Sequence, residues 1–277
     1  MGHSPHRRRL IINADDFGLA RSINQAVVCA HGEGVLTSAS LMVNGGASDE
    51  AVEFARQNPK LGVGLHLTLV CGRSARPARE IPGLVNQQGQ FSNNAIVAGL
   101  NYFTRRELLG QLRSEITAQF EKFHSTGLPL DHVNGHLNMH LHPVVFGVIL
   151  ENVKRFAIRH VRLTRDPFWL NARLARGQWC YRAAHGLIFW LMSCWARPRL
   201  RQSGIGHTDW VFGLLQNARV NEEFVLKLLP RLPVGDSELY SHPSLDEFRH
   251  EFDALVSSRV RTAFEREKIE LIRYQDL

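Results

Sequence analysis

The sequence has few features of a secreted, disulfide-bonded or membrane-spanning protein. Its 277 residues include four cysteines, with no CxxC pair and no regular spacing, which argues against a disulfide framework and a cysteine zinc site. The longest apolar run, 186–196, is too short to cross a bilayer. The apolar run after Arg9 is soon interrupted by Asn13, so a signal peptide is not expected. These absences predict a cytoplasmic protein, at most peripheral at the inner face of a membrane.

The composition is otherwise that of an ordinary globular protein, with 44% hydrophobic and 21% charged residues. No GxSxG motif is present, so an exposed serine nucleophile of the hydrolase type is not indicated. The length fits one α/β barrel-type domain over residues 1–277.

Short apolar segments typical of strands alternate with helical patterns along the chain. A helix with capping-box spacing is expected to open at Thr104–Glu107, another to have Pro143 in its first turn, and one long helix to cover 245–264. Such alternation without internal repeats predicts a parallel sheet, open or closed into a barrel. Strands are expected at 9–14, 36–44, 61–69, 130–137, 160–164, 237–243 and 269–274.

Two adjacent carboxylates follow the first expected strand. Asp15 and Asp16 point in opposite directions if the chain stays extended, but a turn at Phe17–Gly18 could place both around one centre. They could share a metal ion, or one could bind metal while the other acts as a general base. The structural alternative is that one of them caps the following helix or loop.

Histidines follow near the ends of later strands. His66 lies in an apolar strand, where a lone histidine is more often a core residue than a ligand. The residue His242 is a candidate proton donor, or a hydrogen-bonded turn residue before Pro243. Between them, one short segment carries four histidines within eleven residues: His132, His136, His140 and His142.

Metal binding is the leading interpretation of this histidine cluster. A strand that turns at Gly135 could bring His136, with His140 as a further candidate, to Asp16 and His66. Mixed His and Asp ligands suit zinc and other transition-metal ions with one position open for water.

The positive charge of the chain is concentrated in one segment. Eleven Lys and Arg residues lie between Lys154 and Arg201, against the single acid Asp166. A helical insertion at about 168–215 is expected there, at the mouth of the barrel and in contact with an anionic membrane. The alternatives are that its tryptophans pack onto the barrel or form a homodimer contact. Four of the five tryptophans lie between Lys154 and Arg201: Trp169, Trp179, Trp190 and Trp195.

Four motifs occur in a characteristic order and spacing: "NADDFG", "GLHLTL", "DHVNGHLNMHLHP" and "ELYSHP". Together they resemble the YdjC-type carbohydrate deacetylases, the family of chitooligosaccharide deacetylase, over nearly the whole chain. The phrases "LTSASLMVNG" and "DWVFGL" are similar to the hopanoid-biosynthesis-associated branch. The resemblance implies a TIM-like (β/α) barrel, with some distortion and the helical insertion. It also implies one divalent metal ion, Mg or Zn, on Asp16, His66 and His136, with the base at Asp15.

The implied reaction is hydrolysis of the N-acetyl group of an amino sugar, in this branch an N-acetylglucosamine-containing glycolipid (a hopanoid). His242 is expected to protonate the leaving amine, with His140 in reserve. Two positions depart from the family pattern: Asn134 stands where many relatives have Asp, and Asn138 where a His-x-His-x-His run is common. Both departures concern contacts around the ligands or with substrate, because neither residue is an implied ligand.

Two other functions stay open on the sequence. A metal-dependent phosphoesterase acting on nucleic acid would fit the pI near 9.6, although no nucleic-acid-binding motif is present and nucleic acid is not the expected partner. A non-catalytic, membrane-associated scaffold would keep the fold without the chemistry, yet none of the three implied ligands is missing.

Overall fold

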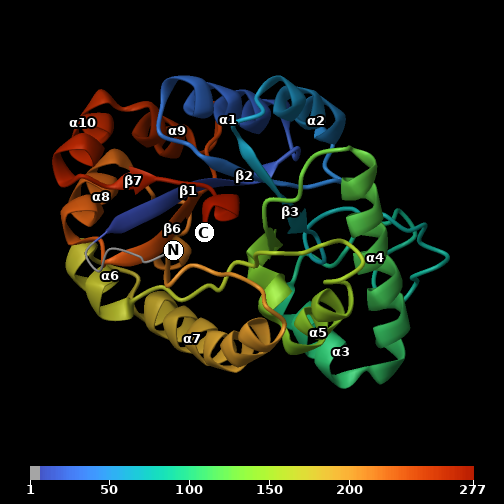
Figure 1. Ribbon diagram of the computed structural model, residues 1–277. Helices are drawn as coiled ribbons and strands as arrows, with labels where there is room; N and C mark the ends of the chain where they lie inside the picture. The colour runs from blue at the N-terminus through green and yellow to red at the C-terminus, as the bar shows by residue number, and fades with distance from the viewer. Residues whose placement is uncertain (1–6) are drawn as a thin grey trace.

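The computed structural model describes residues 7–277. Their strands form one parallel sheet in the order β4-β3-β2-β1-β6-β5, with β7 also paired to β1. The sheet curls into a half-barrel, and Figure 1 shows the helices arranged around it. The strands are β1 (Arg8–Phe17), β2 (Ser38–Leu41), β3 (Gly62–Leu67), β4 (Val133–Gly135), β5 (Trp210–Phe212), β6 (Gly235–Ser241) and β7 (Glu270–Leu271).

The helices follow the strands in sequence, as the alternating pattern predicts. Pro143 is the first residue of α5, where its missing N–H costs nothing. No helix within residues 7–277 is both long enough and apolar enough to cross a membrane. The helices are α1 (Arg21–Glu33), α2 (Ser48–Gln57), α3 (Ala95–Thr104), α4 (Leu109–Ser125), α5 (Pro143–Glu151), α6 (Phe168–Leu174), α7 (Trp179–Gln202), α8 (Glu222–Leu228), α9 (Arg249–Val256) and α10 (Ser258–Glu267).

β1 is the central strand and is buried from Leu10 to Phe17. Side chains on one face, including Leu10 and Ile12, join the main core beneath the helices. On the other face Ile11 packs with Ile272 and Tyr274 inside the curl of the sheet. Burial on both faces explains why consecutive positions of this strand, Leu10–Ile12, are all apolar.

The TIM-like barrel implied by the family resemblance is present as a half-barrel, with a curled parallel sheet flanked by helices. The segment expected as a strand at 160–164 makes only isolated parallel bridges, Val133 with Val161 and His160 with Gly206. Its neighbours β4 and β5 are three residues long, which leaves edges too short for a regular ladder. The segment nevertheless lies between β4 and β5. Val161 forms its bridge with Val133 of β4, and the N–H of Val211 in β5 donates to the Arg165 carbonyl.

Two expectations about helices are wrong. Helix α3 was not expected, and Thr104 is its last residue rather than the cap of α4, which has no side-chain cap. The long helix expected over 245–264 is two helices, because the extended backbone of Ser257 ends α9 and its hydroxyl caps α10. Within the range predicted for the insertion, 168–215, residues 210–212 form β5 and pair with β6.

A buried polar cluster fixes α6 and α7 to the turn that follows β5. The Asp166 carboxylate accepts hydrogen bonds from the Asn171 amide and from the Leu215 N–H, both at 3.0 Å. The Arg182 guanidinium and the Gln216 amide donate to the Asn171 carbonyl oxygen at 3.0 and 2.7 Å. Burial raises the pKa of Asp166 to about 7, although these donors oppose the rise.

This pKa predicts a pH-dependent stability. An acid whose pKa is raised on folding takes up a proton when the protein folds. The contribution of Asp166 to the free energy of unfolding is therefore lost as the pH rises from about 4 to 7, by up to about 1.4 kcal/mol per pH unit. The Asp166→Asn variant should lack this component. The free energy of unfolding of the variant, minus that of the wild type, should therefore increase between pH 5 and pH 7. Urea unfolding at pH 5, 6 and 7 measures the difference; parallel curves would show that Asp166 titrates normally.

Candidate metal centre

A distortion of β1 brings its two carboxylates to the same place. The pairing of β1 with β2 shifts register between Ala14 and Phe17, and Asp16 adopts a left-handed backbone with φ of 63°. In a regular strand the adjacent side chains of Asp15 and Asp16 would face opposite sides of the sheet, whereas a bulge redirects one of them. The redirection therefore lies at Asp16 itself, one residue before the turn predicted at Phe17–Gly18.

Asp16 faces two histidines from neighbouring strand ends. Its Oδ1 lies 2.9 Å from Nδ1 of His136 and 3.2 Å from Nε2 of His66. One potential ligand atom from each of the three residues lies within 4.8 Å of the others. Burial alone would raise the pKa of Asp16, but His136 and His66 hold it well below its usual value. The structure therefore brings together the three residues expected to hold a metal ion.

The turn that directs His136 lies after it rather than at Gly135. Gly135 is extended, with φ of −164°, and its backbone continues β4. The next turn is formed by Leu137 and Asn138, whose φ values of 50° and 55° are left-handed. Consecutive non-glycine residues in this region are strained, and here the strain takes the chain out of the sheet immediately after His136.

The donor set suits a divalent ion. His66 Nε2 is buried and has no hydrogen-bond partner among the described residues, so its lone pair is available to a metal. An imidazole pair with one carboxylate is a ligand set that zinc and similar ions accept, with further positions left for water or substrate.

Asp15 is held differently, by a buried arginine. Arg162 donates to both of its oxygens, Nη1 to Oδ2 at 2.7 Å and Nη2 to Oδ1 at 2.9 Å. The same guanidinium also pairs with Glu238 on β6 at 2.7 Å, and Glu238 accepts a hydrogen bond from the Tyr274 hydroxyl. Burial would raise the pKa of Asp15, but Arg162 and then His66 bring it far below the usual range. Asp15 therefore stays ionised at any ordinary pH.

The other candidate histidines are spread over different surroundings. His242 lines the cavity above the metal centre, with Nδ1 3.9 Å from Glu251. His140 is buried with Nε2 3.0 Å from the Arg162 carbonyl and does not line the cavity, and burial lowers its pKa to about 3. This placement disfavours His140 as the reserve donor. His132 lies in a separate buried array and His142 in the cavity wall, so only one histidine of the sequence cluster joins the centre.

A cavity of about 620 Å³ opens over Asp15, His66 and His136. Its walls are largely apolar and come from two helices that the sequence places far apart, α3 and α7. Tyr240 and Asn138 lie among the polar lining groups. The apolar wall residues are Ile96, Leu100 and Phe103 of α3 and Ile188, Phe189 and Met192 of α7.

Several site residues were missed by sequence reasoning. Arg162 and Glu238 were read as ordinary strand residues, although a charge inside an apolar strand is itself a signal of a buried partner. Ser40 and Asn13 gave no signal, because small polar residues are common at strand ends. The α3 wall was missed together with its helix.

The motifs of the sequence and the geometry of the site agree with the comparison to known families. The model of the YdjC-like protein family matches residues 9–266. The chain belongs to the YdjC-like family. The match contains all the residues of the metal centre and both walls of the cavity.

Curated relatives match over about half of this chain. A carbohydrate deacetylase of Geobacillus stearothermophilus is 40% identical over 162 residues, which are 57% of this chain and 62% of the relative. A carbohydrate deacetylase of Brevibacillus brevis is 35% identical over 150 residues, 54% of this chain and 57% of the relative. The aligned region thus spans about six tenths of the length of these relatives.

A solved structure is similar over almost the whole chain. It is an Enterococcus faecalis protein named as a candidate cellobiose-phosphate cleavage protein, with 26% identity and a TM-score of 0.74 over 98% of both chains. The half-barrel and its helices are therefore shared with a crystallographically determined protein.

The cluster makes a direct prediction about metal binding. We expect the wild type to bind one divalent ion, and Asp16→Asn, His66→Gln and His136→Gln each to weaken binding by more than the roughly 10–100-fold typical of changes around a ligand. Metal analysis after dialysis and competition with a chromophoric chelator measure this. His185→Gln is the matched control, because His185 lines the same cavity outside the cluster. Retention of metal by all three ligand variants would place the ion elsewhere.

Proposed function

We propose that the protein is a metal-dependent carbohydrate N-deacetylase. The observation that carries the proposal is the cluster of Asp16, His66 and His136 beside the ionised Asp15 at the foot of a cavity. Relatives at 35–40% identity are named carbohydrate deacetylases, and their names agree with this arrangement.

The residues around the cluster have the groups that amide hydrolysis requires. A divalent ion, Mg or Zn, would supply a Lewis acid that activates water and polarises the amide carbonyl. Asp15 accepts the proton of the attacking water, and Arg162 keeps its carboxylate ionised and oriented. His242, in the cavity wall, donates a proton to the leaving amine. The products are acetate and a free amino sugar.

The walls of the cavity favour a substrate with an apolar part. Sugar hydroxyls need hydrogen-bond partners when they lose water, and the walls supplied by α3 and α7 offer few. We therefore propose an N-acetylglucosamine-containing glycolipid, of the hopanoid type suggested by the sequence motifs. Its amino sugar lies over the metal centre and its apolar portion between the two helices.

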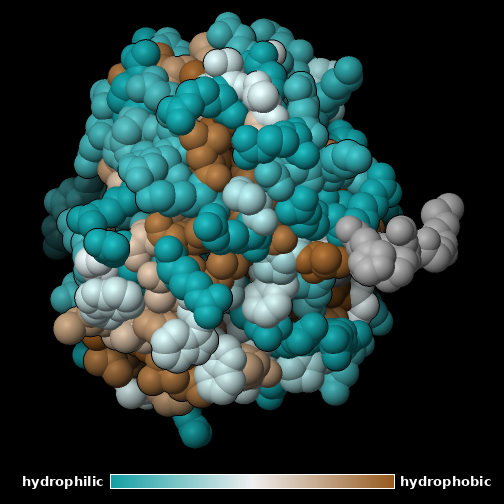
Figure 2. Space-filling model, turned by 90° about the vertical axis from the view of Figure 1, so that its left-hand side faces the viewer, coloured by the Kyte–Doolittle hydropathy of each residue, from teal (hydrophilic) through white to brown (hydrophobic). Residues whose placement is uncertain are grey.

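Contact with an anionic membrane is part of the same proposal. Figure 2 shows apolar and weakly polar side chains over the lower part of one face, where α6 and α7 lie. Trp169 is 78% exposed, and Trp179 and Trp190 are about half exposed. Trp195 instead packs against Phe146, so the packing alternative holds for that tryptophan. Aromatic rings beside arginines suit the headgroup region.

The two alternatives from the sequence gain no specific support. A phosphoesterase acting on nucleic acid would need basic residues at the cavity, but Arg162 and Arg182 are buried in ion pairs or hydrogen bonds. A non-catalytic scaffold would not need Asp16, His66 and His136 to lie together, so this alternative does not explain their cluster.

Mass spectrometry tests the reaction. Incubation of the metal-loaded protein with an N-acetylglucosaminyl lipid should remove one acetyl group. Asp15→Asn should keep its metal while turnover falls about 10²–10⁴-fold, because the proton acceptor is gone; thermal melting checks its fold. Unchanged substrate mass with the wild type would refute the proposal, and loss of metal from Asp15→Asn would make Asp15 a ligand.

Vesicle sedimentation tests the membrane contact. Each basic residue near an anionic surface contributes about 1 kcal/mol, so reversing the exposed Arg173, Arg176 and Arg201 to Glu should release the protein from anionic vesicles at low salt. Reversal of Arg261 and Arg266 on α10 is the matched control and should leave binding unchanged. Equal sedimentation of both variants, or none by the wild type, would leave the surface without a membrane role.

A further inference from the structure

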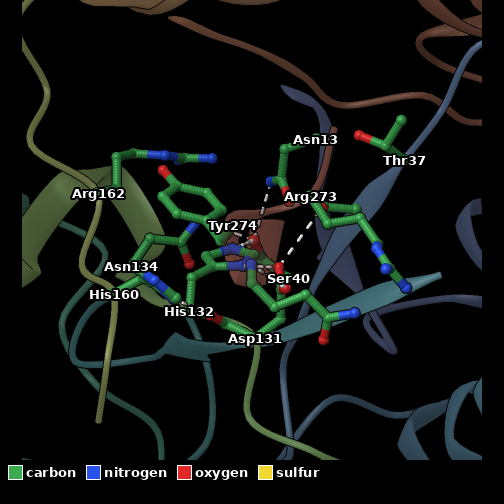
Figure 3. A network of polar contacts seen from close by, with 12 residues as sticks. Asn13, Thr37, Ser40, Asp131, His132, Asn134, His160, Arg162, Arg273 and Tyr274 are labelled. Atoms are coloured by element: carbon green, nitrogen blue, oxygen red, sulfur yellow. Dashed lines mark hydrogen bonds and ion pairs between the residues drawn. The ribbon is translucent and has the colours of Figure 1, made fainter. Parts of the chain in front are cut away.

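A buried array of polar side chains lies behind the metal centre. Ser40 Oγ is 2.9 Å from Nε2 of His132, and Nδ1 of His132 is 3.0 Å from Oδ2 of Asp131 (Figure 3). All three side chains are at most 2% exposed, and none lines the cavity. The order is that of a nucleophilic triad, but no substrate can reach Ser40, so the array must act on its neighbours.

When His132 is a neutral imidazole, the protons along this array point in one direction. Although burial favours the neutral acid, His132 holds the pKa of Asp131 below its usual value, so the carboxylate accepts and His132 Nδ1 donates. Nε2 of His132 is then an acceptor, and the Ser40 hydroxyl donates to it. The lone pairs of Ser40 are left to accept from Nδ2 of Asn13 at 2.9 Å and Nδ2 of Asn134 at 2.8 Å.

Both amides also contact the proposed catalytic groups. Nδ2 of Asn13 and Nδ2 of Asn134 donate to Oδ1 of Asp15 at 2.8 and 3.0 Å. Because Nδ2 of Asn134 donates to Ser40 and Asp15, its carbonyl oxygen Oδ1 faces the other way and lies 2.7 Å from Nδ1 of His66. A carbonyl oxygen only accepts, so Nδ1 of His66 carries the proton and Nε2 presents its lone pair to the metal centre.

The fold reserves space for this array. A Cβ on Gly64 of β3 would lie 2.5 Å from the His132 ring, so glycine at this position is what allows the ring to reach Ser40. On another side the Tyr274 ring stacks on His132 at 4.4 Å between centroids. The ring is therefore held in one place and one orientation.

We propose that Ser40, His132 and Asp131 are positioning residues of the metal centre. They fix the amides of Asn13 and Asn134, which in turn orient Asp15 and keep the proton of His66 on Nδ1, away from the metal. This inference rests on the metal site of the proposed function, but the proton position in His66 can be measured without metal or substrate.

The experiment compares three serine variants. Ser40→Ala should weaken metal binding about 10–100-fold, as changes to groups that orient ligands do. In the metal-free protein, at a pH high enough to keep His66 neutral, ¹⁵N NMR should show its single proton shared between both nitrogens. Ser40→Thr keeps the hydroxyl and should restore affinity and tautomer. Ser237→Ala is the matched control, because Ser237 is equally buried, on β6, and its hydroxyl has no hydrogen-bond partner among residues 7–277.

A folded Ser40→Ala protein with wild-type metal affinity and His66 tautomer would overturn the inference. Where Ser40→Ala does not fold, the wild type decides: a single proton on Nδ1 of His132 supports the array, and a proton on Nε2 overturns it. A wild type that binds no metal would refute the proposed function, and the tautomers of His66 and His132 would still test whether the array orients Asn134 and His66.

Discussion

Arg162 is the buried cation on which the arrangement of the site depends. It comes from the segment that lies between β4 and β5 without forming a regular strand, and it reaches Asp15 on β1 and Glu238 on β6. Removing one partner of such a group leaves charges buried without compensation, which costs about 3–5 kcal/mol. The ion pairs therefore join the irregular part of the half-barrel to its central strands, and they keep the carboxylate beside the metal centre charged.

The metal centre depends equally on backbone irregularity. Asp16 is itself a candidate ligand with a left-handed backbone, and the left-handed turn at Leu137–Asn138 directly follows the candidate ligand His136. A regular β1 would have sent the side chains of Asp15 and Asp16 to opposite faces of the sheet. Local strain at both positions is offset by the surrounding core and sheet, as is typical where a fold supports function.

The sequence predicted the alternation of strands and helices, the family and the three residues that meet at the centre. These features depend on local periodicity and on motifs that span few residues. It did not predict α3, whose apolar pattern was read as loop, nor the half-barrel, because closure is decided by pairing between distant strands. The roles of Arg162 and Ser40 also depend on distant partners: Arg162 binds Asp15, and Ser40 donates to His132, each more than seventy positions away in the chain. Asn134, noted only as a departure from the family pattern, is the residue that joins both groups of contacts.

The position of β1 in the sheet has a consequence for how the chain folds. Its ladder with β2 is local, but its longest ladder pairs Arg8–Ala14 with Gly235–Ser241. Contacts of such sequence separation form slowly, since most of the chain must be arranged first. Until β6 is in place, one edge of β1 has no hydrogen-bonding partner. An unpaired strand edge of this kind can pair with another unfolded chain and cause aggregation. Because central strand β1 pairs with β6, more than two hundred positions later, chaperone protection before that pairing forms is valuable to this protein.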